Sequence, residues 1–73
     1  MNEYAVEVTS NKEKETIALP GSSKFAVALL AMQLFSKNRA EKIRVVHASS
    51  WSETTYKHCT LEEGRLSFKE KYS

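Results

Sequence analysis

Three side chains of the types that bind zinc occur in the second half of the chain: His47, His58 and Cys59. Their spacing matches no tight metal-binding signature. His58 and Cys59 are adjacent, and adjacent residues of a strand point to opposite faces of the sheet, so they would not bind one ion together. We therefore expect no metal site, with His58 lining the edge of the core and Cys59 half exposed.

Nucleophilic catalysis by Cys59 would require a lowered thiol pKa, a histidine in reach and a pocket that excludes water. The sequence indicates none of these. Ser22-Ser23-Lys24 lacks the glycine spacing of a phosphate-binding loop, and helix capping explains it better. A chain of 73 residues also has little room for an enclosed pocket beside a core. We expect no catalytic residue, no enzymatic activity and no cofactor.

Basic side chains are concentrated in residues 37–73, which hold 8 Lys or Arg against 5 Glu, whereas residues 1–36 hold 3 Lys against 4 Glu. Carried on adjacent strands, such side chains could bind a phosphate backbone or an acidic protein. A solvated sheet face kept soluble by its lysines is the alternative. The candidates for anion or nucleic-acid binding are Arg44, Lys57, Arg65, Lys69 and Lys71.

Apolar side chains occupy two opposite sides of the stretch 24–35, which is predicted to be helical and to run to about Asn38. One small sheet can cover only one side. The other side then needs more of this chain, a second copy or another protein to cover it. The residues predicted on that second side are Val27, Leu30 and Leu34, opposite Phe25, Leu29, Met32 and Phe35.

Trp51 lies in a polar segment, Ala48-Ser-Ser-Trp-Ser52, that is predicted to be a connection. An exposed tryptophan among small polar groups is typical of a binding anchor. The alternative is that Trp51 folds back over the helix and covers its second apolar side, since tryptophan is usually well buried.

Alternating apolar and polar residues predict the strands that must position these groups. Segments 4–9 and 15–19 form the first hairpin, Pro20-Gly21 ends it, and Ser22 or Ser23 caps the helix. Segment 42–47 follows the helix. A second hairpin joins 54–60 to 65–71 through a three-residue loop with Gly64 in the left-handed conformation.

That loop fixes a register for the second hairpin, with Leu61 opposite Arg65 and Lys57 opposite Lys69. It also places Cys59 opposite Ser67 and His58 opposite Phe68. The like charges of Lys57 and Lys69 would then repel each other across the strands. One face of this hairpin, predicted to belong to the core, holds Tyr56, His58, Thr60, Leu66, Phe68 and Tyr72.

The predicted architecture is α+β: a single domain over residues 1–73 with the order ββαβββ, in which an antiparallel sheet of four or five strands packs against one helix. This format is similar, in architecture alone, to small accessory proteins of phages and mobile elements, including inhibitors of host defence enzymes. That similarity implies inhibition by surface occlusion. It identifies no target and assigns a role to no residue.

The N-terminal segment has no signal-peptide pattern, and the apolar run 25–35 is too short to span a bilayer. A single cysteine suits a reducing compartment, so we expect a cytoplasmic protein without a membrane partner. The predicted function is a non-enzymatic protein-binding module that acts stoichiometrically through Trp51 or the second helix side. A homodimer is one predicted form of this module. The alternative is a nucleic-acid-binding accessory protein that uses the basic sheet face.

Overall fold

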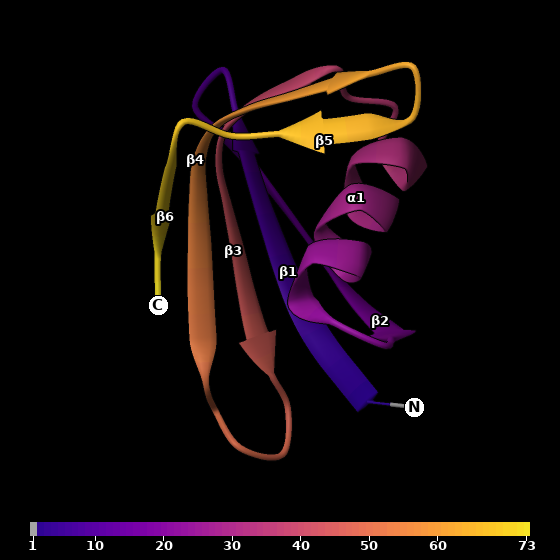
Figure 1. Cartoon of the computed structure of the whole chain (residues 1–73), viewed down its shortest axis with the longest axis vertical. Coiled ribbons are helices and arrows are strands. Elements are labelled where there is room, and N and C mark those ends of the chain that lie inside the picture. Colours follow the sequence, from indigo (N-terminus) through magenta and orange to yellow (C-terminus); the bar gives the residue numbers. More distant parts are fainter. Residues whose placement is uncertain (1) are drawn as a thin grey trace.

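The computed structural model describes residues 2–73, and Met1, which the expected domain 1–73 includes, lies outside the described residues. Six strands and one helix succeed one another within residues 2–73 (Figure 1). In chain order they are β1 (Asn2–Ser10), β2 (Glu13–Gly21), α1 (Lys24–Leu34), β3 (Arg39–His47), β4 (Glu53–Glu62), β5 (Arg65–Ser67) and β6 (Glu70–Tyr72).

All strand pairs are antiparallel, and the sheet has the order β2-β1-β3-β4-β5, with β6 also paired to β4. Helix α1 lies on one face of this curved sheet (Figure 1). The predicted α+β class, with one helix on an antiparallel sheet, is confirmed. The strand predicted over 65–71 is divided, because Phe68 and Lys69 interrupt the regular ladder between β5 and β6. The described sheet therefore has six strands rather than four or five.

Strands β1 and β2 form the predicted first hairpin, in which Ser10 pairs with Glu13. Its two loop residues, Asn11 and Lys12, have φ angles of 53° and 66°. Two successive residues with positive φ are typical of the type I′ turn, whose twist matches that of the flanking strands.

Helix α1 begins where the capping prediction placed it, because the Ala26 backbone N–H donates to Ser23 Oγ at 3.1 Å. It ends earlier than predicted, at Leu34 instead of about Asn38. Ser36 adopts φ 56°, its N–H donates to the Gln33 carbonyl, and the Lys37 N–H donates to the Met32 carbonyl. These two bonds form a Schellman motif, which terminates a helix.

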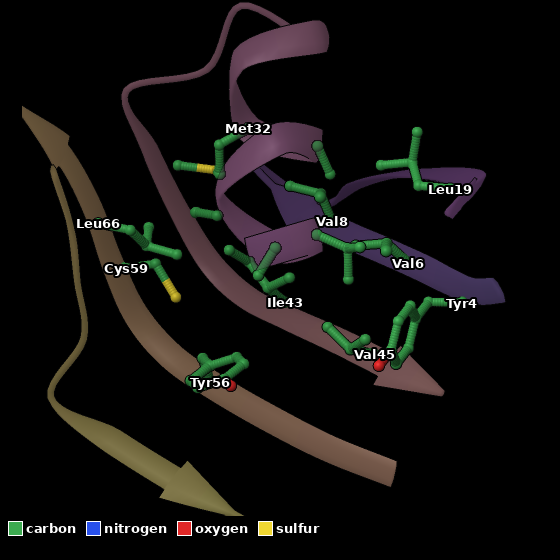
Figure 2. Close-up of a cluster of buried hydrophobic side chains, with 14 residues drawn as sticks. Tyr4, Val6, Val8, Leu19, Met32, Ile43, Val45, Tyr56, Cys59 and Leu66 are labelled. Atoms are coloured by element: carbon green, nitrogen blue, oxygen red, sulfur yellow. The ribbon is translucent and has the colours of Figure 1, made fainter. Parts of the chain in front are cut away.

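The core lies between α1 and the inner face of the sheet, as Figure 2 shows for Val6, Val8, Ile43, Val45 and Met32. The helix contributes two fully buried alanines, at positions 28 and 31, whose small side chains let it approach the strands closely. The second helical side was predicted to include Val27, and this assignment is wrong. Val27 is only 1% exposed, because the side of the helix that faces the sheet carries Ala28 and Ala31 and lies between the two predicted apolar sides.

The alternation of β4 changes phase at His58, which has a φ angle of 56° inside the strand. Tyr56 and Cys59 both enter the core although they are three positions apart. Strand β3 changes phase at the same level, since its buried residues are Ala40 and then Ile43. The prediction for His58 and Cys59 is therefore reversed: Cys59 is buried and His58 is exposed. Tyr72, also predicted in the core, is exposed.

The predicted register of the second hairpin is wrong by one residue. Leu61 pairs with Leu66 and Glu62 with Arg65, which leaves Glu63 and Gly64 as a two-residue turn with φ angles of 50° and 75°. This is again the type I′ pattern. Lys57 consequently faces Glu70 instead of Lys69, so the expected repulsion between Lys57 and Lys69 does not arise from direct pairing.

Candidate binding surfaces

One flank of α1 carries two leucines at the surface: Leu30 is 37% exposed and Leu34 is 54% exposed. At about 100° per residue they lie about 40° apart around the helix, next to the direction of Val27. Val27 faces the end of β2, because a Cβ added at Gly21 would overlap Val27 Cγ1. The Leu30–Leu34 flank therefore stands on the β2 side of the helix, beside an edge of the sheet.

The opposite flank of α1 carries an aromatic cluster. The ring of Phe25 meets those of Tyr56 and Phe68 at centroid distances of 5.9 and 6.3 Å. Tyr56 and Phe68 lie 4.9 Å apart. Rings at such separations attract one another in addition to burying apolar area. Phe25 and Phe68 nevertheless remain 39% and 37% exposed, so the chain covers this flank only in part. The sequence pattern gave no pairing for Phe25.

Trp51 is 78% exposed and does not fold back over the helix, so the alternative of an internal cover is wrong. Its loop is well fixed. The Trp51 N–H donates to the His47 carbonyl at 2.8 Å, and the Ala48 N–H donates to the Glu3 carbonyl at 2.9 Å. The His47 ring lies edge-on to Tyr4 with centroids 5.1 Å apart. Trp51 is therefore presented to solvent by an ordered turn.

The outer face of the sheet, opposite α1, carries two adjoining open hollows where β3 and β4 continue past the end of β1. Their volumes are about 440 and 290 Å³. Glu41 and His58 line both, at the level where the β3–β4 ladder skips a pair. Arg39 and Lys69 line the larger hollow, and Lys42 and Lys57 line the smaller one.

The structure separates the five predicted anion-binding residues. Lys57 and Lys69 line the hollows. Arg44 is engaged by Glu53, to which it donates two hydrogen bonds. Arg65 pairs with Glu62 at the β4–β5 turn, and Lys71 pairs with Tyr56, an inward-facing residue, so Lys71 is on the helix side of the edge. The five residues do not form a continuous track.

Three further basic residues line the hollows without being among the five predicted anion ligands: Arg39, Lys42 and His58. Arg39 falls between the predicted helix end near Asn38 and the predicted strand 42–47, and it lies in β3. His58 was placed in the core because its positive φ has no signal in a single sequence. Lys42 was recognised as an outward-facing basic residue of its strand, and the structure confirms that position.

Cys59 is 2% exposed, and burial raises its thiol pKa to about 11. At neutral pH the thiol is protonated, which is the opposite of what a nucleophilic cysteine needs. Within residues 2–73 no group of three or more His, Cys, Asp or Glu side chains is arranged to hold a metal ion. The described part of the chain contains no helix of the length and hydropathy required to cross a membrane.

Comparison of this chain with protein-family models, curated proteins and solved structures found no match.

Proposed function

We propose that this chain is a cytoplasmic, non-enzymatic binding module that acts stoichiometrically on a protein partner. In this proposal it is an accessory protein of a phage or mobile element that inhibits a host protein by occluding part of its surface. The observation that carries the proposal is the apolar pair Leu30 and Leu34, exposed beside β2, the one long edge of the sheet among the described residues.

Strand β2 is suited to pair with an added strand. Its nine residues pair with β1 on one side only, so the other side presents unpaired backbone groups. The opposite edge of the sheet is divided between β5 and β6, each of three residues. An extended partner segment would gain main-chain hydrogen bonds along β2, which is the mode called β-augmentation.

The backbone of an edge strand does not discriminate between the side chains of a partner segment. The Leu30–Leu34 flank of α1 would provide that discrimination. Ile17 and Leu19 of β2 pair with Val6 and Tyr4, and all four face the helix. A strand added beside β2 would place alternate side chains under Leu30 and Leu34. The fitting partner is therefore an extended segment with apolar residues at every second position.

Trp51 provides a second contact in this proposal. The Ala48 N–H bonds to the Glu3 carbonyl, and Glu3 pairs with Pro20 near the end of β2. Trp51 thus stands at the same end of the sheet as Pro20, two strands away. A large exposed aromatic side chain there fits an anchor for the partner.

The proposal is tested by photo-crosslinking. A photoreactive amino acid is placed at Thr16 of β2 or at Glu70 of β6, and capture from host lysate is compared with and without Leu34→Gln. We expect one protein crosslinked from position 16, not from position 70, and lost with Leu34→Gln. Tyr72→Gln, an exposed change at the other edge, should not reduce capture.

Light scattering on a size-exclusion column separates the possible occupants of β2. A monomer that crosslinks a different protein supports the proposal. A salt-insensitive dimer that loses its dimer mass on Leu34→Gln assigns the edge to a second copy and overturns it, as does capture that is equal from positions 16 and 70.

The nucleic-acid alternative receives support from one observation, the adjacent Lys42 and Lys57 on the outer face. A phosphate backbone would be bound with a steep salt dependence and with similar losses for each lysine removed. The engagement of Arg44 by Glu53 and the positions of Arg65 and Lys71 interrupt such a track, so the protein-binding proposal is preferred.

A further inference from the structure

We propose that the two hollows of the outer sheet face form a binding site for the phosphate group of a compact ligand. This site is separate from the β2 edge, which the proposed function uses. The combined space is open, and the larger hollow alone, about 440 Å³, falls within the range of about 300–1,000 Å³ that is usual for small-molecule sites.

Charge in the walls of the hollows is strongly unbalanced. Four cations, two in each hollow, line the walls together with one carboxylate, that of Glu41, and Glu70 of β6 faces Lys57 from outside the walls. The ion pairs formed within residues 2–73 are Lys37–Glu15 and Arg44–Glu53, so none of the four cations is neutralised by a salt bridge. They are Arg39, Lys42, Lys57 and Lys69.

Lys42 and Lys57 face each other directly across the β3–β4 ladder. Like charges in this position are unfavourable unless something compensates them. The Lys57 ammonium lies 5.4 Å from the centre of the Tyr72 ring, a weak cation–π contact that leaves its charge in place. An anion between the two ammonium groups would convert the repulsion into two attractive contacts.

The backbone at this level is built in an unusual way. His58 holds φ 56° within a strand, a conformation that costs a non-glycine residue free energy and tends to persist at functional sites. It directs His58 outward and Cys59 inward, and this change of phase lies at the level of the two hollows. Thr9 lines the smaller hollow, and its buried hydroxyl has no hydrogen-bond partner.

A phosphate group fits this combination better than a carboxylate does. Its two negative charges match the Lys42–Lys57 pair, and its several oxygens can accept from Arg39 and Lys69 as well. Arginine adds a planar pair of donors that suits phosphate, and lysine adds compact charge. Because the cations end at the hollows, the ligand is compact rather than a long polyanion.

The test is titration of the ¹⁵N-labelled full chain with inorganic phosphate, a nucleoside monophosphate and a short single-stranded oligonucleotide. We expect saturable amide shifts confined to the hollows, centred on Lys42, Lys57 and His58. Lys42→Gln and Lys57→Gln should each weaken binding by about tenfold. Lys71→Gln removes the same charge on the other side of the sheet and should change affinity less than about twofold.

The two phosphate sources give distinct results. Tighter binding of the monophosphate assigns the site to phosphate esters, and equal binding assigns it to free phosphate. Shifts that never saturate, or equal losses for Lys71→Gln and Lys57→Gln, overturn the site. Oligonucleotide affinity that rises with length and is also lost with Arg65→Gln overturns it in favour of nucleic acid. Amide spectra of each variant establish that the fold is retained, and Leu34→Gln should leave phosphate binding unchanged.

Discussion

Arg44 of β3 donates two hydrogen bonds to the carboxylate of Glu53 in β4. Its Nε donates to Oε2 at 2.7 Å and its Nη2 donates to Oε1 at 3.0 Å. These hydrogen bonds keep the pKa of Glu53 below its ordinary value and raise that of Arg44. Both groups stay charged at neutral pH, and the guanidinium is not available to a ligand on the outer face.

Glu53→Gln should therefore release Arg44 for anion binding. We expect the variant to elute from a heparin column at higher salt than the parent does, because one more cation faces the polyanion. Glu63→Gln removes the same negative charge at a turn where no ion pair is formed, and it is the matched control. If both variants elute at the same salt concentration, net charge alone governs retention, and the Arg44–Glu53 ion pair does not.

Two neighbouring positions of α1, one exposed and one buried, should respond differently to an added charge. Leu30→Glu places its carboxylate at a partly exposed position, and we expect the free energy of unfolding to change by no more than about 1 kcal/mol. Val27→Glu buries a charge without a partner and should prevent folding. Urea unfolding followed by circular dichroism measures both. Loss of the fold in Leu30→Glu would mean that this flank belongs to the core.

The β4–β5 turn makes a sharp prediction about register. Glu63 adopts φ 50° ahead of Gly64, a conformation that asparagine accepts more readily than glutamate. Glu63→Asn should raise the free energy of unfolding by roughly 0.5–1 kcal/mol. Glu62→Asn, one residue earlier and paired with Arg65 in the ladder, should give no such gain. A gain in stability for Glu62→Asn alone would contradict the two-residue turn and support the predicted three-residue loop.

Stability should fall at alkaline pH because of two buried acids. Burial raises the pKa of Cys59 from 9.0 to about 11 and also raises the pKa of Tyr56. The unfolded chain loses these protons first, so this stabilisation is complete below pH 9 and is lost as pH rises towards 11. Urea midpoints should fall over that range, and less steeply for Cys59→Ala. An identical slope in both proteins would contradict the assignment to Cys59.

Local patterns predicted well what depends on neighbouring residues. The alternation of Tyr4, Val6 and Val8 placed β1, and the serines before the helix placed its cap at Ser23. The helix end was missed because Ser36, an ordinary residue, takes the left-handed conformation and ends the helix before Asn38. Val27 was misassigned because the pattern of large apolar residues left out Ala28 and Ala31, whose side of the helix faces the sheet.

The errors in β4 have one physical source. A single positive φ at His58 exchanges the faces of every residue that follows, since side chains alternate with a period of two. Cys59 then enters the core and His58 leaves it. Arg39 and His58 reach the hollows through this shift and its counterpart in β3, so the candidate phosphate site could not be assembled from alternation alone. Trp51, in a short polar loop, is exposed, as one of the two alternatives for it predicted.

The order β2-β1-β3-β4 also bears on how the chain folds. Each pair β1–β2 and β3–β4 is a local hairpin, whereas β1 meets β3 only after α1 has brought distant segments together. Closing that long loop has the largest entropic cost. We expect Val45→Ala, on the β1–β3 seam, to slow refolding in stopped-flow experiments, and Gly64→Ala, in a late turn, mainly to speed unfolding. The seam that joins two hairpins would thus govern how fast the protein forms.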